Sequence, residues 1–122
     1  LQLAQWLTER PAIISVLHPA LPSCPGHELW KRDFTGSTSV FSIVFAEGTT
    51  REVIVAFVDA LALFKVGYSW GGVTSLAVPW FDLPRSHGSS YEDRLVRLNV
   101  GLEDVNDLIS DLDQALRRAG LA

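Results

Sequence analysis

Two segments with a period of two constrain the fold of this chain more than any other feature. In the segment 39–46, every second side chain is large and apolar: Phe41, Ile43 and Phe45. The segment 94–100 alternates in the same way, and one of its faces consists of Val96, Leu98 and Val100. The opposite face of this second segment carries Leu95, Arg97 and Asn99. A period of two predicts strands that bury one face in a core.

Two amphipathic helices are predicted to pack against these strands. Thr49 and Glu52 have the spacing of a capping box, and the helix that they open is expected to reach about Phe64. Its apolar stripe consists of Val53, Ala56, Phe57, Ala60, Leu61 and Phe64. A second helix is expected after an N-cap at Asp104, with acidic residues near its start and basic ones near its end, as the helix dipole prefers. These charged residues are Asp107, Asp111, Arg117 and Arg118, and the apolar stripe consists of Val105, Leu108, Ile109, Leu112, Leu116 and Ala119.

Shorter elements complete the expected architecture. Residues 1–7 are typical of helical turns that end before Pro11, and residues 27–33 of one or two more turns. A proline-rich connector (18–26) and a polar loop (84–90) are not regular elements. Short strands are predicted at 65–70 and 75–79, and the β-branched run 12–17 could form another. We therefore expect an α+β two-layer fold in which a small, mostly antiparallel four-stranded sheet has helices packed on one face.

Composition excludes several classes of function. The 122 residues suit one domain, and a net charge of −4 without a basic run argues against nucleic-acid binding. The longest apolar stretch, 53–64, contains Asp59 and is too short to cross a bilayer, and the first residues do not form a signal peptide. The chain has no methionine, and its mean hydropathy of +0.20 is high. These two features predict a piece of a longer protein with apolar surface facing a partner.

Few residues stand out as chemical groups. Because the three histidines (His18, His27 and His87) have no ligand partners at metal-site spacing, a structural role is favoured for each. Cys24 lies between prolines without a nearby base, so it is interpreted as an ordinary thiol. The pair at 71–72 could form a turn or let the backbone approach a ligand closely. Arg97 could be an exposed strand arginine or a clamp for a carboxylate.

Three motifs occur in the order and spacing of one known family. They are PALPSCPGHELWKRDFTG at 19–36, YSWGG at 68–72 and RLNVGLEDVNDLISDLDQAL at 97–116. Over nearly its whole length the chain resembles the C-terminal domain of the pyridoxal-phosphate enzymes of cysteine and methionine metabolism, most of all the bacterial cystathionine β-lyases. Trp70 favours this branch, because relatives acting at the γ-carbon commonly carry leucine there. Asn99 and the pair at 73–74 depart from the usual family residues.

The resemblance implies a role for the chain and for four of its residues. Residues 1–122 would be the small domain of a fold type I enzyme that closes over the substrate. A large domain outside this chain would hold pyridoxal phosphate on a lysine. Arg97 would bind the substrate α-carboxylate, while Ser69, Trp70 and Tyr68 would line the pocket. A cytoplasmic homodimer or homotetramer and β-elimination of cystathionine or another cysteine conjugate to thiol, pyruvate and ammonia are implied, without metal, nucleic acid or membrane.

Two alternatives remain, and the lysines limit what the chain can do alone. The domain could belong to a γ-synthase, γ-lyase or sulfhydrylase of the same family, or it could be a binding or interaction domain without catalysis. The only lysines are Lys31 and Lys65, and neither lies in a motif for covalent cofactor binding. We therefore expect that these 122 residues by themselves neither bind the cofactor covalently nor turn over substrate.

Overall fold

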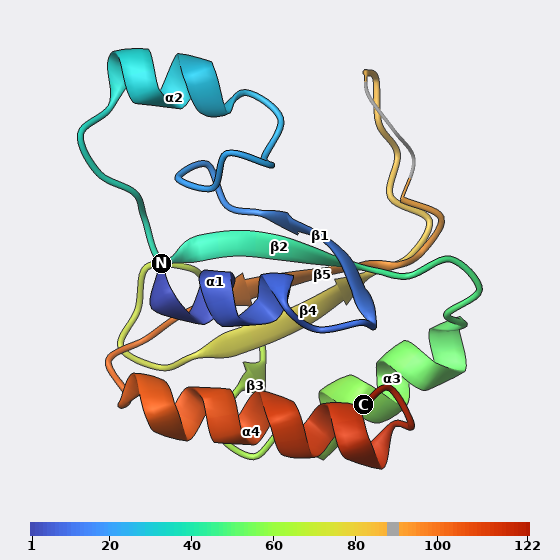
Figure 1. The fold of residues 1–122 in the computed structure, drawn as a ribbon. Helices are drawn as coiled ribbons and strands as arrows, with labels where there is room; N and C mark the ends of the chain where they lie inside the picture. Colours follow the sequence, from blue (N-terminus) through green and yellow to red (C-terminus); the bar gives the residue numbers. More distant parts are fainter. Residues whose placement is uncertain (88–90) are drawn as a thin grey trace.

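The sheet is larger than the sequence predicts. The computed structural model describes residues 1–87 and 91–122 and contains a five-stranded sheet of order β1-β2-β5-β4-β3 (Figure 1). The strands are β1 (Ile13–Leu17), β2 (Val40–Phe45), β3 (Lys65–Val66), β4 (Leu76–Trp80) and β5 (Leu95–Asn99). The expected α+β class is confirmed, but the count of four strands is wrong. β3 pairs with β4 in parallel, whereas the other three pairs are antiparallel.

The strand register divides the sheet into two faces. Residues that pair directly share a face, so the pairing of Phe41 with Leu98 and of Leu98 with Ala77 defines one row across three strands. The face containing this row is buried in the core, and its members include Phe41, Ile43, Phe45, Ala77, Val96 and Leu98. Burying each large side chain stabilises the fold by about 1.5–3 kcal/mol. The alternation predicted for both central strands is confirmed.

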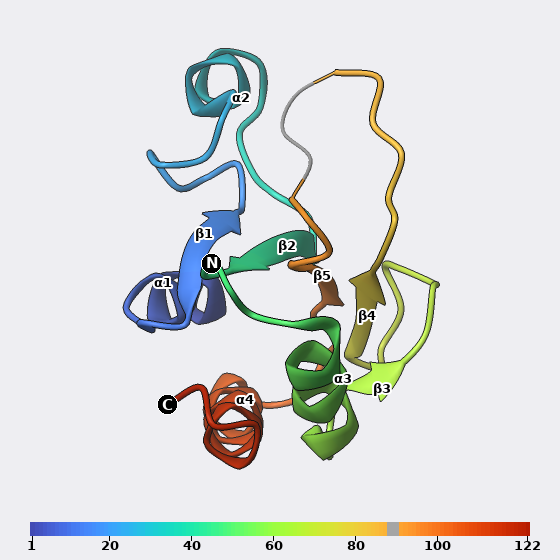
Figure 2. The same ribbon diagram turned by 90° about the vertical axis from the view of Figure 1, so that its right-hand side faces the viewer.

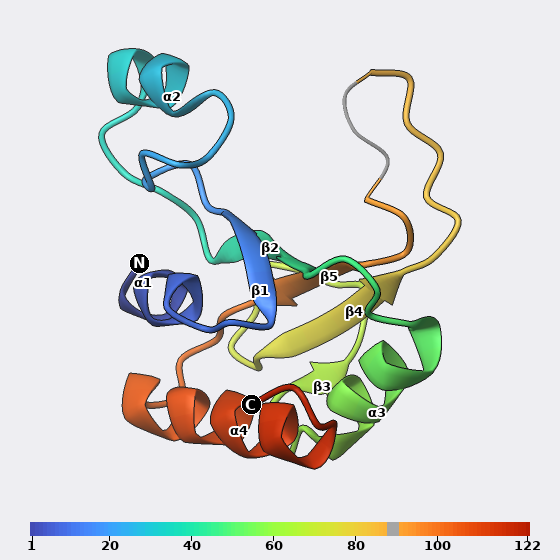
Figure 3. The same cartoon turned by 45° about the vertical axis from the view of Figure 1, so that its right-hand side comes forward.

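Three of the four helices in the described residues cover this apolar face. They are α1 (Gln2–Thr8), α3 (Arg51–Ala60) and α4 (Val105–Arg118), which lie on the same side of the sheet in Figure 2. The fourth helix, α2 (His27–Asp33), has no buried residue. Figures 1 and 3 show α2 and the described ends of the β4–β5 connection, 81–87 and 91–94, rising on the side away from α3 and α4. The expectation of helices on one face therefore holds for α1, α3 and α4 but not for α2.

The long helices begin with side-chain caps, one of them shifted by a residue. Asp104 accepts hydrogen bonds from the amides of Asn106 and Asp107, as predicted for α4. In α3 the N-cap is Thr50, which accepts from Val53 N, while the Thr49 hydroxyl donates to Ala46 O. The predicted capping box of Thr49 and Glu52 is wrong, because the Thr49 hydroxyl closes the preceding turn instead. The buried residues of α3 are Ile54, Phe57 and Val58, so the predicted stripe is also rotated.

A buried carboxylate explains why α3 ends early. The helix was expected to reach Phe64, but it stops at Ala60 and the next residue is extended. The carboxylate of Asp111 on α4 accepts from the amides of Ala62 and Leu63 at 2.8 Å each and from that of Phe64 at 3.2 Å. Because these amides donate to Asp111, they do not donate to the carbonyl oxygens of α3, and the helix ends. Asp111, which was expected only as an acidic residue that suits the helix dipole, is 5% exposed and ties α4 to the end of α3.

The strand predicted at 65–70 is mostly a loop. Only the two residues of β3 pair with β4, and the backbone then leaves the sheet. Gly71 has a φ of 81°, a left-handed conformation that favours glycine. The YSWGG motif therefore lies in the segment 67–75, which we call the β3–β4 loop.

Candidate functional site

Arg97 lies at the centre of the sheet face that no helix covers. This second face is made by the remaining alternate residues of β2, β4 and β5: Val40, Ser42, Val44, Leu76, Val78, Trp80, Leu95, Arg97 and Asn99. Arg97 pairs with Ser42 on one side and Val78 on the other. Its neighbours across the sheet are therefore small or apolar, and its half-buried side chain rises from the middle strand of five.

The guanidinium of Arg97 is positioned by a backbone oxygen and an aromatic ring rather than by a carboxylate. Nη2 donates to the backbone oxygen of Tyr68 at 2.5 Å, and the guanidinium carbon lies 5.8 Å from the centre of the Trp80 ring. The Tyr68 ring in turn meets Trp80 edge-on at 5.9 Å. Within residues 1–87 and 91–122, no carboxylate pairs with Arg97. Five other arginines each form an ion pair: Arg10, Arg32, Arg51, Arg94 and Arg117. Arg97 therefore keeps donor groups that could bind an external anion in a bidentate manner.

Asn99 lies two residues further along β5, on the same face, and is 1% exposed. Its Oδ1 accepts from the Ser39 hydroxyl and from the amide of Gly71, both at 2.8 Å. Its Nδ2 donates to Thr74 O at 3.3 Å. The β3–β4 loop is therefore attached to β5 through Tyr68 at one end and through two backbone groups near the other.

A second polar cluster fixes the end of the same loop. The Glu103 carboxylate accepts from the amide and the hydroxyl of Ser75 at 2.9 and 2.8 Å, and the Ser75 hydroxyl accepts from Gly101 N at 2.9 Å. Burial raises the pKa of Glu103, but the hydrogen bonds from Ser75 outweigh it and leave this pKa below its ordinary value. A side chain at Gly101 would lie 2.2 Å from Val73 O, so this position needs glycine.

The structure brings some of the predicted site residues together. Arg97 contacts the backbone of Tyr68, whereas Ser69 and Trp70 lie on the exposed part of the β3–β4 loop. The side chains of Tyr68 and Trp70 are 68% and 70% exposed, so the loop presents aromatic surface. Sequence reasoning missed the contact of Trp80 with Arg97, and it left the role of Asn99 open. Pairing the predicted strands 76–80 and 95–99 in antiparallel register could have revealed the contact of Trp80 with Arg97.

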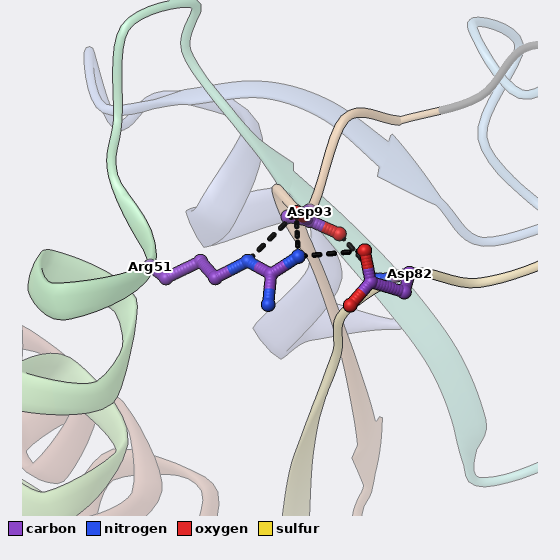
Figure 4. Close-up of polar contacts among 3 residues, drawn as sticks. All are labelled: Arg51, Asp82 and Asp93. Atoms are coloured by element: carbon purple, nitrogen blue, oxygen red, sulfur yellow. Dashed lines mark hydrogen bonds and ion pairs between the residues drawn. The ribbon is translucent and has the colours of Figure 1, made fainter.

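A cluster of ion pairs joins the two ends of the connection between β4 and β5 (Figure 4). Arg51, the first residue of α3, bonds Asp93 through Nε at 2.8 Å and Asp82 through Nη2 at 2.7 Å. The amide of Asp82 donates to Asp93 as well. This amide, followed by Arg51, holds the pKa of Asp93 below its ordinary value. The predicted polar loop 84–90 continues from here, and its residues 88–90 lie outside the described part.

The other candidate groups have structural contacts. His18 is buried, and its Nδ1 accepts from the amide of Ala20. The ring of His27 bonds Pro19 O, and His87 is exposed. Burial raises the pKa of the Cys24 thiol, which makes it less reactive. In the described residues no three His, Cys, Asp or Glu side chains are grouped as a metal site would require, and no helix there has the length and apolarity to cross a membrane.

Comparison with known proteins identifies the family. A family model described as Cys/Met metabolism PLP-dependent enzyme matches residues 1–117. The chain belongs to this family. It is 44% identical over 123 residues to cystathionine beta-lyase MetC of Escherichia coli (strain K12), covering 97% of the chain and 31% of that protein. Cystathionine gamma-lyase of Homo sapiens is 41% identical over 127 residues, with 95% and 30% covered.

Two further relatives widen the range of named activities. A protein named L-alanine/L-glutamate racemase from Wolbachia pipientis wMel is 41% identical over 121 residues, covering 97% of the chain and 30% of the racemase. The solved O-acetylhomoserine sulfhydrylase of Wolinella succinogenes superposes with a TM-score of 0.78 at 30% identity, over 94% of this chain and 30% of that structure. The chain thus spans about a third of the length of the relatives it matches.

The two lysines of this chain lie apart from Arg97, so neither could hold the family's pyridoxal phosphate covalently beside it. The ammonium of Lys65 donates to Ala62 O and lies exposed beside the short strand β3. Lys31 is exposed on α2, away from the sheet. Neither amine belongs to the second face on which Arg97 lies. What this chain offers there is a cation for a carboxylate, not an amine for an aldehyde.

Proposed function

We propose that the chain is the small domain of a carbon–sulfur β-lyase and that Arg97 binds the α-carboxylate of its amino-acid substrate. The single observation that carries this proposal is the half-buried guanidinium of Arg97, which is held by Tyr68 O and Trp80 but paired with no described carboxylate. Membership in a family of amino-acid enzymes supplies the class of anion.

The chemistry of this chain would be positioning. A forked guanidinium can take both oxygens of a carboxylate and so fix the direction of the bonds at Cα. Each charge-assisted hydrogen bond of this kind is worth about 1.5–3 kcal/mol. Holding the reacting bond in the productive direction multiplies that gain in rate. Ser69, Trp70 and Tyr68, on the loop above Arg97, would line the remainder of the pocket.

The rest of the catalytic machinery would lie outside these residues. Pyridoxal phosphate, when bound by a large domain, supplies the electron sink for loss of the Cα proton. Cystathionine and water would then yield homocysteine, pyruvate and ammonia. Since this chain lacks a lysine at the second face, it would be inactive alone. A cytoplasmic enzyme that assembles as a homodimer or homotetramer is part of the same proposal.

A second candidate is a γ-lyase or sulfhydrylase. The similarity to the human γ-lyase, at 41% identity, favours it almost as much as the 44% identity to the E. coli β-lyase favours the first. Trp70 supports the β-lyase, because γ-acting relatives commonly carry leucine at this position. Product analysis separates the two, since β-elimination of cystathionine yields pyruvate and γ-elimination yields 2-oxobutyrate.

The test uses the full-length protein that carries this chain. We expect Arg97→Ala to raise KM and to lower kcat/KM for cystathionine by about a hundredfold or more, because the loss of two such hydrogen bonds corresponds to about 3–6 kcal/mol, while the cofactor absorbance stays unchanged. Arg118→Ala, which removes an exposed arginine at the end of α4, is the matched control. Equal activity of the two variants, or loss of folding in Arg97→Ala alone, would contradict the proposal.

A further inference from the structure

We propose that Asn99 is a positioning residue that fixes the β3–β4 loop and thereby orients Arg97 toward the substrate carboxylate. The inference rests on the proposed function of Arg97. It assigns a role to a buried amide that neither the sheet nor the hydrophobic core requires.

The hydrogen bonds of Asn99 are directed at the loop rather than at its own strand. Three groups outside β5 bond its side chain, and two of them, Gly71 N and Thr74 O, belong to the β3–β4 loop. Residues 71–74 are exposed and Gly71 has a left-handed φ, so this stretch has little packing of its own. Without Asn99, the amide of Gly71 and the carbonyl of Thr74 would lose these partners.

The loop is in turn a partner of Arg97. Tyr68 O, three residues before Gly71, accepts from Arg97 Nη2. Arg97 and Asn99 lie on the same face of β5, two residues apart, so they hold the loop at neighbouring points. Displacement of the loop would move Tyr68 O and leave the guanidinium without its only described hydrogen-bond acceptor. Asn99 therefore acts on the carboxylate through Tyr68 and Arg97, without touching substrate itself.

The first measurement reads the loop directly. Amide hydrogen exchange by mass spectrometry is compared between the full-length protein and its variants, for a peptide that spans 68–74. In Asn99→Ala we expect the amide of Gly71 to exchange at least about tenfold faster, because its acceptor is gone. Peptides from α4 should not change. Asn99→Asp keeps an oxygen for Gly71 N and should restore much of the protection, whereas Ser39→Ala removes only the contact outside the loop and should leave it intact.

The second measurement separates positioning from general stability. For Asn99→Ala we expect KM for cystathionine to rise about five- to tenfold with kcat changed less than about threefold, because substrate binding is affected first. A merely structural role would lower the amount of folded enzyme and leave KM unchanged. Asn99→Asp should lie between Asn99→Ala and the unmodified enzyme. The double variant Arg97→Ala/Asn99→Ala should be no worse than Arg97→Ala, since Asn99 acts through Arg97.

Each result decides one of the two ideas. Unchanged exchange at Gly71, or an unchanged KM in Asn99→Ala while Arg97→Ala raises it, would overturn the role of Asn99 and leave the proposed function standing. If the unmodified full-length protein releases no pyruvate, or Arg97→Ala has normal kinetics, the proposed function is wrong and the inference falls with it. Faster exchange at Gly71 would then establish a structural anchor only.

Discussion

Replacing Asp111 with alanine should destabilise the chain more than replacing any other acidic residue discussed above. Its carboxylate is the acceptor for the amides of Ala62, Leu63 and Phe64. Hydrogen bonds to a charged acceptor contribute about 1.5–3 kcal/mol each. Ala62 is exposed, so water can replace its bond, but Leu63 is half-buried and Phe64 is buried. The two shielded amides give about 3–6 kcal/mol.

The cost of burying the carboxylate places the expected loss of unfolding free energy near the lower end of this range. The folded chain already bears the free-energy cost of burying the Asp111 carboxylate, and the alanine variant is relieved of it. We therefore expect a loss of about 3 kcal/mol in the free energy of unfolding, a large part of the 5–15 kcal/mol typical of a domain. Asp111→Asn keeps one oxygen acceptor and should lose less.

Urea unfolding of the 122-residue chain, followed by tryptophan fluorescence and by circular dichroism, measures the change. Asp107→Ala is the matched control, because Asp107 is an exposed residue of the same helix. Such a surface change should stay within about 0.5 kcal/mol. If Asp111→Ala unfolds within 1 kcal/mol of this control, the carboxylate does not hold the end of α3 and the reasoning is refuted.

Three further predictions concern the loops and the thiol. Because folding lowers the pKa of Glu103, its contribution to stability is complete above the ordinary glutamate pKa of about 4.3 and is lost as pH falls below it. Glu103→Gln should therefore flatten the fall in the free energy of unfolding between about pH 5 and pH 3. Parallel curves for the variant and the unmodified chain would contradict this. Arg51→Ala should speed proteolysis within 82–93 and leave the urea midpoint nearly unchanged, because its ion pairs with Asp82 and Asp93 are exposed. Cleavage at the original rate would show that these ion pairs do not restrain the connection. Cys24 should react with a disulfide reagent at pH 7 more slowly than glutathione does, since partial burial raises its pKa. A rate equal to that of glutathione would contradict this prediction.

Period-two alternation made the central strands predictable, because only one phase of β2 and of β5 buries a uniformly apolar face. Phe41 and Leu98 therefore lie where the pattern puts them, and Arg97 falls on the other face. The sequence predicted a strand at 65–70, but it could not show that only the two exposed residues of β3 pair, in parallel, with Leu76 and Ala77. Nor could it distinguish Thr49 from Thr50 as the cap, since both hydroxyls suit a helix start.

The contacts that the sequence did not reveal are long-range and polar. Asp111 is separated from its amide partners by 47 to 49 residues, and Asn99 from Gly71 by 28. A carboxylate in the first turns of a helix normally interacts with the helix dipole, so nothing local shows that Asp111 is buried. The family resemblance predicted Arg97 and Tyr68 as site residues, but only the register of β4 on β5 puts Trp80 beside Arg97.

The two faces of β5 link the stability of the chain to its proposed site. Val96 and Leu98 are buried against the helices, while Arg97 and Asn99 alternate with them on the second face. A slip of one residue in the pairing of β5 would exchange these sets, placing a guanidinium in the core and valine at the site. Because the desolvation of an unpaired charge is so unfavourable, the core fixes the register and hence the position of Arg97. The precision of the proposed carboxylate site on this face would follow from the packing of the opposite one.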